Sequence, residues 1–173
     1  DGDPCTVDAC DPVAGVSHVP AAVDDGDPCT DDLCLPSGAV AHGPVLSPAC
    51  CAIETDPTVA SSPGLSGAFL TSCAHPIQTG ATAGIFGDRE RAGLVHGVVL
   101  TRDGTPLPGA VIRVLDRPEL GMTRSRVDGR WDMRVLGGGH MTFTISGPGT
   151  GAARYLSAQR AAEVPRAGDV RVA

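Results

Sequence analysis

The chain has 173 residues and a formal net charge of −7, and aromatic residues make up only 3% of it. So few large apolar side chains exclude a large core, and the length allows one ordinary domain or two small ones. Residues 1–49 carry nine Asp and no Arg, whereas residues 94–173 carry eleven Arg against seven acidic residues, which argues against nucleic-acid binding by the N-terminal half and indicates separate modules.

Residues 1–49 contain a repeat with a period of 24 residues. The sequence Asp-Gly-Asp-Pro-Cys-Thr at residues 1–6 recurs at residues 25–30, and Ser17-His18 recurs as Ala41-His42. Periods of this length are typical of stacked or strung units. We expect two irregular repeats here, and because residue 1 already lies inside a repeat, we expect the chain to be a piece of a longer protein.

The cysteines indicate an oxidising compartment, because a small core commonly needs covalent support. We therefore expect a secreted or cell-surface protein in which disulfides hold the N-terminal region. No apolar run approaches the length of a membrane span, so we expect no span in this piece. The cysteines that we assign to disulfides are Cys5, Cys10, Cys29, Cys34, Cys50, Cys51 and Cys73.

The repeat segment resembles the short Cys- and Asp-rich extracellular repeat of slime-mould matrix proteins, which is also common in myxobacterial surface proteins. Units of that family have further cysteines near their positions 17 and 23, where this chain has Ser17 and Val23, then Ala41 and Ser47. Their joint absence suggests that they pair with each other in the family. The resemblance then implies local disulfides, Cys5–Cys10 and Cys29–Cys34.

The Asp clusters of the repeats offer carboxylate oxygens, which calcium binds. Their spacing does not fit an EF-hand loop, however, and two units offer little to fix six or more ligands. Zinc is less favoured still, because two cysteines at this gap without a second close pair make a poor tetrahedral site. We expect a solvated acidic surface with no bound metal.

Residues 50–93 have the composition of a linker, rich in Gly, Ala and Ser. We expect Cys73 to bridge to Cys50 or Cys51, which leaves one thiol over. Cys73-Ala74-His75 is a weak metal motif, and a disulfide with an exposed His is the favoured interpretation.

Residues 94–173 consist of short strands separated by turns. The clearest strand, 141–146, places Met141, Phe143 and Ile145 on one face and polar side chains on the other, as in an antiparallel sheet with one buried face. The strands predict an all-β fold, a small antiparallel β-sandwich. Its expected turn residues are Gly104, Gly109, Gly129 and Gly138, and its expected core is Val99, Ile112, Val114, Trp131, Met133, Val135, Met141, Phe143 and Ile145.

The alternation of side chains between the two faces of each strand decides the register of the central hairpin, because a loop one residue longer or shorter places the charged side chains on the opposite face. A three-residue loop at 127–129 keeps charge off the core face, and it requires a positive φ at its third residue, Gly129. The expected opposite pairs are Ser125 with Trp131, Thr123 with Met133, and Arg124 with Asp132.

The same region resembles a known domain. Residues 96–99 and 103–111 are similar to the opening of a carboxypeptidase-regulatory-like (transthyretin-like) domain. Residues 118–126, 128–132 and 137–139, with the closing segment 155–160, resemble its version in teneurin-like and Rhs/YD-repeat proteins. In that family the domain is non-catalytic and lies upstream of, or plugs, a large β-propeller and YD-repeat shell. The resemblance also implies a strand within 152–164, where composition favours a helix.

Nothing in the sequence indicates catalysis or a cofactor. Residues 147–152 match a dinucleotide-binding glycine pattern, but the preceding strand alternates, whereas a Rossmann strand is buried on both faces. We expect a non-catalytic structural or interaction module of a large bacterial Rhs/teneurin-like protein, whose partners are the other domains of that protein (the propeller and YD shell) or a protein or glycan at a cell surface. The alternative is a calcium- or carbohydrate-binding adhesion module.

Overall fold

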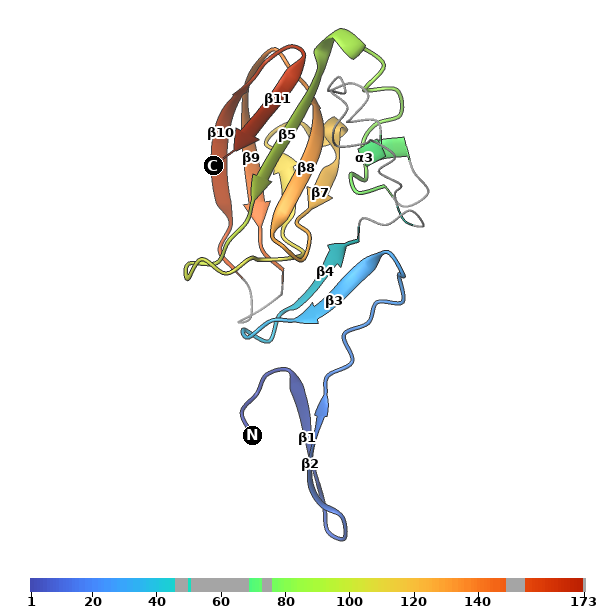
Figure 1. Cartoon of the computed structure of the whole chain (residues 1–173), viewed down its shortest axis with the longest axis vertical. Coiled ribbons are helices and arrows are strands. Elements are labelled where there is room, and N and C mark those ends of the chain that lie inside the picture. Colours follow the sequence, from blue (N-terminus) through green and yellow to red (C-terminus); the bar gives the residue numbers. More distant parts are fainter. Residues whose placement is uncertain (46–49, 51–68, 73–75, 149–154, 173) are drawn as a thin grey trace, which may run out of the picture.

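The computed structural model describes residues 1–45, 50, 69–72, 76–148 and 155–172. Two hairpins precede a two-sheet β-sandwich. The first hairpin lies at one end of the molecule and the sandwich lies at the other (Figure 1). No helix among these residues is long and apolar enough to cross a membrane.

Each repeat forms a regular hairpin, although its composition predicts irregular chain. In the first repeat β1 (Thr6–Asp11) pairs with β2 (Gly15–Pro20), and in the second β3 (Thr30–Cys34) pairs with β4 (Val40–Pro44). Both pairs are antiparallel, and their registers are equivalent: Thr6 lies opposite Pro20 in the first repeat, and Thr30 lies opposite Pro44, 24 residues later, in the second. The two repeats are therefore the same structural unit.

The sandwich is built from two sheets with the orders β10-β9-β6-β7 and β11-β5-β8. Its strands are β5 (Ala92–Val98), β6 (Val111–Val114), β7 (Met122–Arg124), β8 (Arg130–Leu136), β9 (Gly139–Ser146), β10 (Ala158–Val164) and β11 (Gly168–Val172). The all-β sandwich is confirmed, and so is the strand that the resemblance implies near residue 160. All paired strands are antiparallel except β11, which sequence patterning did not predict and which pairs parallel to β5.

Short helical turns complete the described chain. They are α3 (Phe69–Ser72) and the 3₁₀ turns Arg89–Arg91 and Pro118–Leu120.

The core of the sandwich lies between the sheets. Trp131 from β8 and Phe143 from β9 meet there with ring centroids 5.8 Å apart. Burial of each ring stabilises the fold by about 2–3 kcal/mol. Of the residues assigned to the core from sequence, Val99 and Ile145 are partly buried and pack against it; the buried ones are Ile112, Val114, Trp131, Met133, Val135, Met141 and Phe143.

The loop between β7 and β8 has the predicted form. Arg126 N–H donates to the carbonyl of Arg130 at 2.8 Å, and Gly129 N–H donates to the carbonyl of Arg126 at 2.8 Å. Gly129 has a φ of 76°, a conformation that costs glycine nothing. The three-residue loop is confirmed, and Gly104, Gly109 and Gly138 also have positive φ.

The predicted hairpin ladder beyond this loop is wrong. β7 pairs with β6 and β8 pairs with β5, so the two strands belong to different sheets. The Ser125 hydroxyl, expected opposite Trp131, instead donates to the carbonyl of Leu107 at 2.7 Å. Asp132 pairs with Arg126 and not with Arg124. Parity fixes which face of a strand is buried, but it does not fix which sheet the strand joins.

Residues 76–91, which composition assigns to a linker, lie against the sandwich. Gln78 is 2% exposed. Its Nε2 donates to the carbonyls of Leu120 at 2.7 Å and Arg134 at 2.9 Å, and its Oε1 accepts from the Arg134 N–H at 2.7 Å. Thr79 bridges to Met122 on the neighbouring edge strand. Because β7 and β8 are the outer strands of their sheets, this segment closes one open side of the sandwich.

We predict that Gln78→Ala destabilises the sandwich by on the order of 3 kcal/mol, because it removes three hydrogen bonds from buried backbone groups. Urea unfolding followed by Trp131 fluorescence measures this change. Gln159→Ala, on an exposed position of β10, is the matched control and is expected to change stability by less than about 0.5 kcal/mol. Equal stability of the two variants would contradict a folding role for residues 76–91.

Candidate functional site

The aspartates of the repeat motif order the loop that precedes each hairpin. In the second repeat, Asp25 Oδ1 accepts from the Asp27 N–H at 2.9 Å and from the Thr30 hydroxyl at 2.9 Å, and Asp27 Oδ1 accepts from the Cys29 N–H at 2.9 Å. The same three bonds occur one period earlier in the first repeat. These carboxylates therefore replace backbone partners that a loop lacks.

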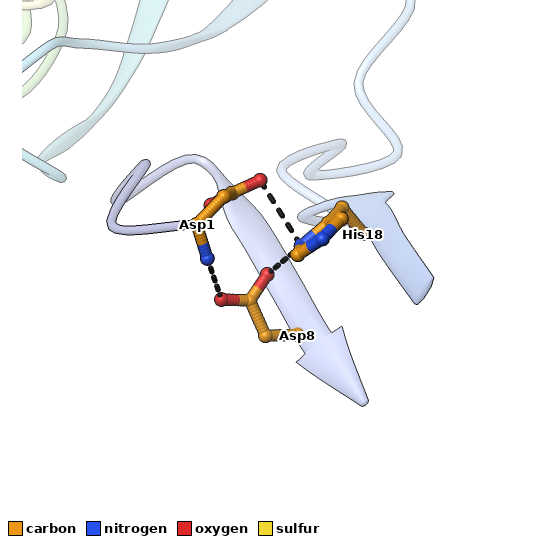
Figure 2. Close-up of side chains that lie close together, drawn as sticks. All are labelled: Asp1, Asp8 and His18. Atoms are coloured by element: carbon orange, nitrogen blue, oxygen red, sulfur yellow. Dashed lines mark hydrogen bonds and ion pairs between the residues drawn. The ribbon is translucent and has the colours of Figure 1, made fainter. Parts of the chain in front are cut away.

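A cluster of two aspartates and one histidine closes the first hairpin. Asp8 and His18 lie directly opposite each other on β1 and β2. Asp8 Oδ1 lies 2.6 Å from His18 Nδ1, and Asp1 Oδ2 lies 3.1 Å from the same nitrogen, so that the imidazole is held between two carboxylates (Figure 2).

The second repeat contains the same cluster. Asp32 Oδ1 lies 2.7 Å from His42 Nδ1, and Asp25 Oδ2 lies 3.4 Å from it. Asp32 Oδ2 also accepts from the Asp25 N–H at 2.9 Å. The hydrogen bond from His42 lowers the pKa of Asp32 below its usual value of 3.8, with a smaller contribution from the Asp25 N–H. In the first repeat the main-chain nitrogen of Asp1, and then His18, lower the pKa of Asp8.

The donor atoms of each cluster do not fit calcium. In each, two carboxylate oxygens and one imidazole nitrogen lie within 4.8 Å of one another. Calcium takes six to eight oxygen ligands, whereas each cluster supplies two carboxylates and a nitrogen that is already hydrogen-bonded to one of them. The clusters clip the strands of each hairpin together. The shared ten-residue separation of Asp8 from His18 and of Asp32 from His42 was the sequence signal for them.

The disulfides join different segments and do not close local loops. Cys5 is bonded to Cys34 with Cα atoms 5.7 Å apart, and Cys29 is bonded to Cys50 with Cα atoms 5.3 Å apart. The expected pairs Cys5–Cys10 and Cys29–Cys34 are therefore wrong, as is a Cys73–Cys50 bond. Cys51 and Cys73 lie outside the described residues.

Strand geometry explains this correction. Cys5 immediately precedes β1 and Cys10 lies near its end, so the two are five positions apart along an extended strand. That distance is roughly 16 Å, against about 7 Å at most between the Cα atoms of a disulfide. Cys10 is exposed and is the free cysteine among the residues that the structure describes.

The second repeat packs against the end of the sandwich. Its Ala41, which is fully buried, lies in one apolar cluster with Leu107 and Ala110 of the sandwich. A Cβ on Gly109 would lie 3.1 Å from the Ala41 Cβ, and one on Gly43 would lie 3.2 Å from the Val127 nitrogen. The second repeat is therefore packed directly against the sandwich. The strands of the first repeat, in contrast, are almost entirely exposed.

A cavity of about 280 Å³ is lined by residues of β5 and β8. Arg126 at its edge is paired with Asp132, and His96 is paired with Asp169 at 2.8 Å. The residues that line it are His96, Gly97, Val98, Arg126, Arg130, Trp131, Asp132 and Arg171, and they include no Ser, Cys or Lys nucleophile.

We predict that His42→Gln returns the pKa of Asp32 toward its usual value and leaves that of Asp8 unchanged. Because His42 lowers the pKa of Asp32, their interaction stabilises the hairpin above the usual Asp pKa and is lost as the pH falls through the folded-state pKa. Carbon-13 NMR titration of the carboxyl groups measures both midpoints. His18→Gln is the reciprocal control; an Asp32 midpoint that does not respond to His42→Gln would contradict the clip.

Comparisons with known proteins agree with both resemblances. Residues 87–165 match the teneurin TTR-like domain, and residues 1–21 and 22–45 each match the Dictyostelium (slime mold) repeat. Over 58 residues the chain is 36% identical to Teneurin-3 of Danio rerio and 40% identical to Teneurin-1 of Gallus gallus and Teneurin-3 of Mus musculus.

These alignments cover 34% of this chain and 2% of each relative, so the chain spans a small fraction of their length. Residues 87–165 of the chain are thus a teneurin TTR-like domain, and two Dictyostelium-type repeats precede it.

Proposed function

We propose that the chain is a non-catalytic structural and interaction module of a large secreted or cell-surface protein of the bacterial Rhs/teneurin type. The TTR-like domain supports the non-catalytic assignment, because the domain serves in that family as a module of larger proteins. The disulfide-linked repeats support an extracellular location, since disulfides persist in oxidising environments.

The observation that carries this proposal is the buried contact between the second repeat and the sandwich. Ala39 and Ala41 are 2% and 0% exposed, and they share an apolar cluster with Leu107 and Ala110. A repeat joined by a free linker would not bury its turn in this way. In the proposed function, the repeats therefore form an arm of defined direction at one end of the sandwich.

The partners that we propose are the other domains of the same protein, a β-propeller and a YD-repeat shell that the sandwich precedes or plugs. The strand β10 is an outer strand of its sheet, and the second repeat contacts the sandwich elsewhere, at Leu107, Gly109 and Ala110. A calcium-dependent adhesion function has less support, because the carboxylates of the Asp-rich motif already bind loop N–H groups or the imidazoles of His18 and His42.

Cross-linking of the full-length protein tests the proposal. The chain has no Lys, so a carboxyl-directed dihydrazide is the suitable reagent. We predict cross-links from Glu163, exposed on β10, to the propeller or the shell, and few from Asp8 in the first repeat. The isolated chain, treated in the same way, supplies the internal cross-links to subtract. Glu163 cross-links confined to this chain would contradict the proposal.

A further inference from the structure

The two cysteines of a repeat have different roles in the structure. Cys5 and Cys29 occupy the first position of their repeats, immediately before the hairpin, and Cys10 and Cys34 occupy the second position, near the end of its first strand. Cys34, a second-position cysteine, is bonded to the first-position cysteine of the repeat before it, 29 residues earlier.

Both first-position cysteines bond toward the C-terminus. Cys5 is bonded to Cys34 in the next repeat, and Cys29 is bonded to Cys50, which follows the second hairpin. Cys50 belongs to neither hairpin, so the two bonds reach different kinds of segment. What they share is their direction, from the first cysteine of a repeat to a cysteine later in the chain. A second-position cysteine is accordingly the one that receives a bond from the N-terminal side.

Cys10 has the backbone setting of Cys34 but lacks its bond. Cys10 lies opposite Val16 in the first hairpin, as Cys34 lies opposite Val40 in the second. Cys10 is exposed and free, and Val16 beside it is 67% exposed, whereas Val40 is half-buried. The second repeat thus serves as an internal comparison in which the equivalent thiol is occupied.

We infer that Cys10 is the attachment site for a further repeat of the same kind on the N-terminal side of Asp1. The first-position cysteine of that repeat, 29 residues before Cys10, forms a disulfide with it as Cys5 does with Cys34. The two thiols lose two protons and two electrons to a small-molecule disulfide such as oxidised glutathione, which leaves as two thiols. This inference concerns the repeats alone and is independent of the function proposed above.

The first repeat differs from the second at one point of the docking face. Gly38 approaches Pro4 of the preceding repeat so closely that a Cβ would lie 3.0 Å from the Pro4 Cβ. Ala14 stands one period before Gly38, but the two turns differ in conformation, because the positive φ is at Gly38 in the second repeat and one residue later, at Gly15, in the first. An incoming repeat therefore meets a turn with a different backbone path, and the range of Cα distances that a disulfide accepts allows its position to adjust.

A fusion tests this inference on the whole chain. A copy of residues 1–24 is placed before Asp1, with Val7→Ile and Ala9→Ser in the copy so that its cysteine peptides have their own masses. The protein is oxidised in a glutathione buffer, free thiols are blocked with N-ethylmaleimide, and a protease that cuts before Asp releases the peptides. The repeats contain no Lys or Arg, so trypsin would not separate them.

We expect the first-position cysteine of the copy to be linked to Cys10, and Cys10 to lose its maleimide label. In the unextended chain, and in a fusion whose copy carries Cys5→Ser, Cys10 is labelled. The native Cys5–Cys34 bridge in the same digest shows that the repeats are folded. That bridge together with a labelled Cys10, or a bond between the two cysteines of the copy, would overturn the inference.

Discussion

An extended strand separates the two cysteines of each repeat, and this constraint determines how the N-terminal half of the molecule is held together. The hairpins have few apolar side chains to bury, so covalent bonds must supply their order. Because Cys5 and Cys10 are too far apart to bond, each bridge has to reach another segment. The result is a series of hairpins in which each disulfide joins one hairpin to the segment that follows it. Each disulfide therefore limits how neighbouring segments can be oriented.

The sandwich provides the fixed end of this arm. Trp131 and Phe143 fill its core, and the loops at one end present small residues on which the turn of the second repeat is buried. Small side chains on both sides, Ala41 and Gly109 among them, allow the two backbones to approach closely. Each hairpin is in turn closed by an Asp–His clip that is strongest when its aspartate is ionised.

The sequence predicted the sandwich well because its strands alternate and its turns contain glycines that accept positive φ, as at Gly129. It did not predict which strands pair. The buried faces of β7 and β8 satisfy parity equally well in one sheet or in two, and the hydroxyl of Ser125 bonds to Leu107 on a segment that patterning does not connect to it. The strand β11 alternates between polar and apolar residues over Asp169 to Val172, but it is only five residues long, so its pattern does not stand out from that of a loop.

The repeats were harder to predict from sequence. Of the 22 residues in their strands, ten are Asp, Ala, Gly or Pro, which have low strand propensity. The cross-strand Asp8–His18 and Asp32–His42 bonds supply what propensity does not. The absent family cysteines suggested local pairing, an argument from composition that neglected the length of the intervening strand. Composition assigns Gln78 to a linker, because hydrogen bonds to distant backbone groups leave no mark in local composition.

The central claim is that disulfides join the repeats to each other and to the segment that follows them. Digestion of the unreduced, oxidised chain before Asp residues, followed by mass spectrometry of the linked peptides, tests it most directly. The account predicts one pair of peptides linked through Cys5 and Cys34 and another linked through Cys29 and Cys50. Peptides linked through Cys5 and Cys10, or through Cys29 and Cys34, would contradict it.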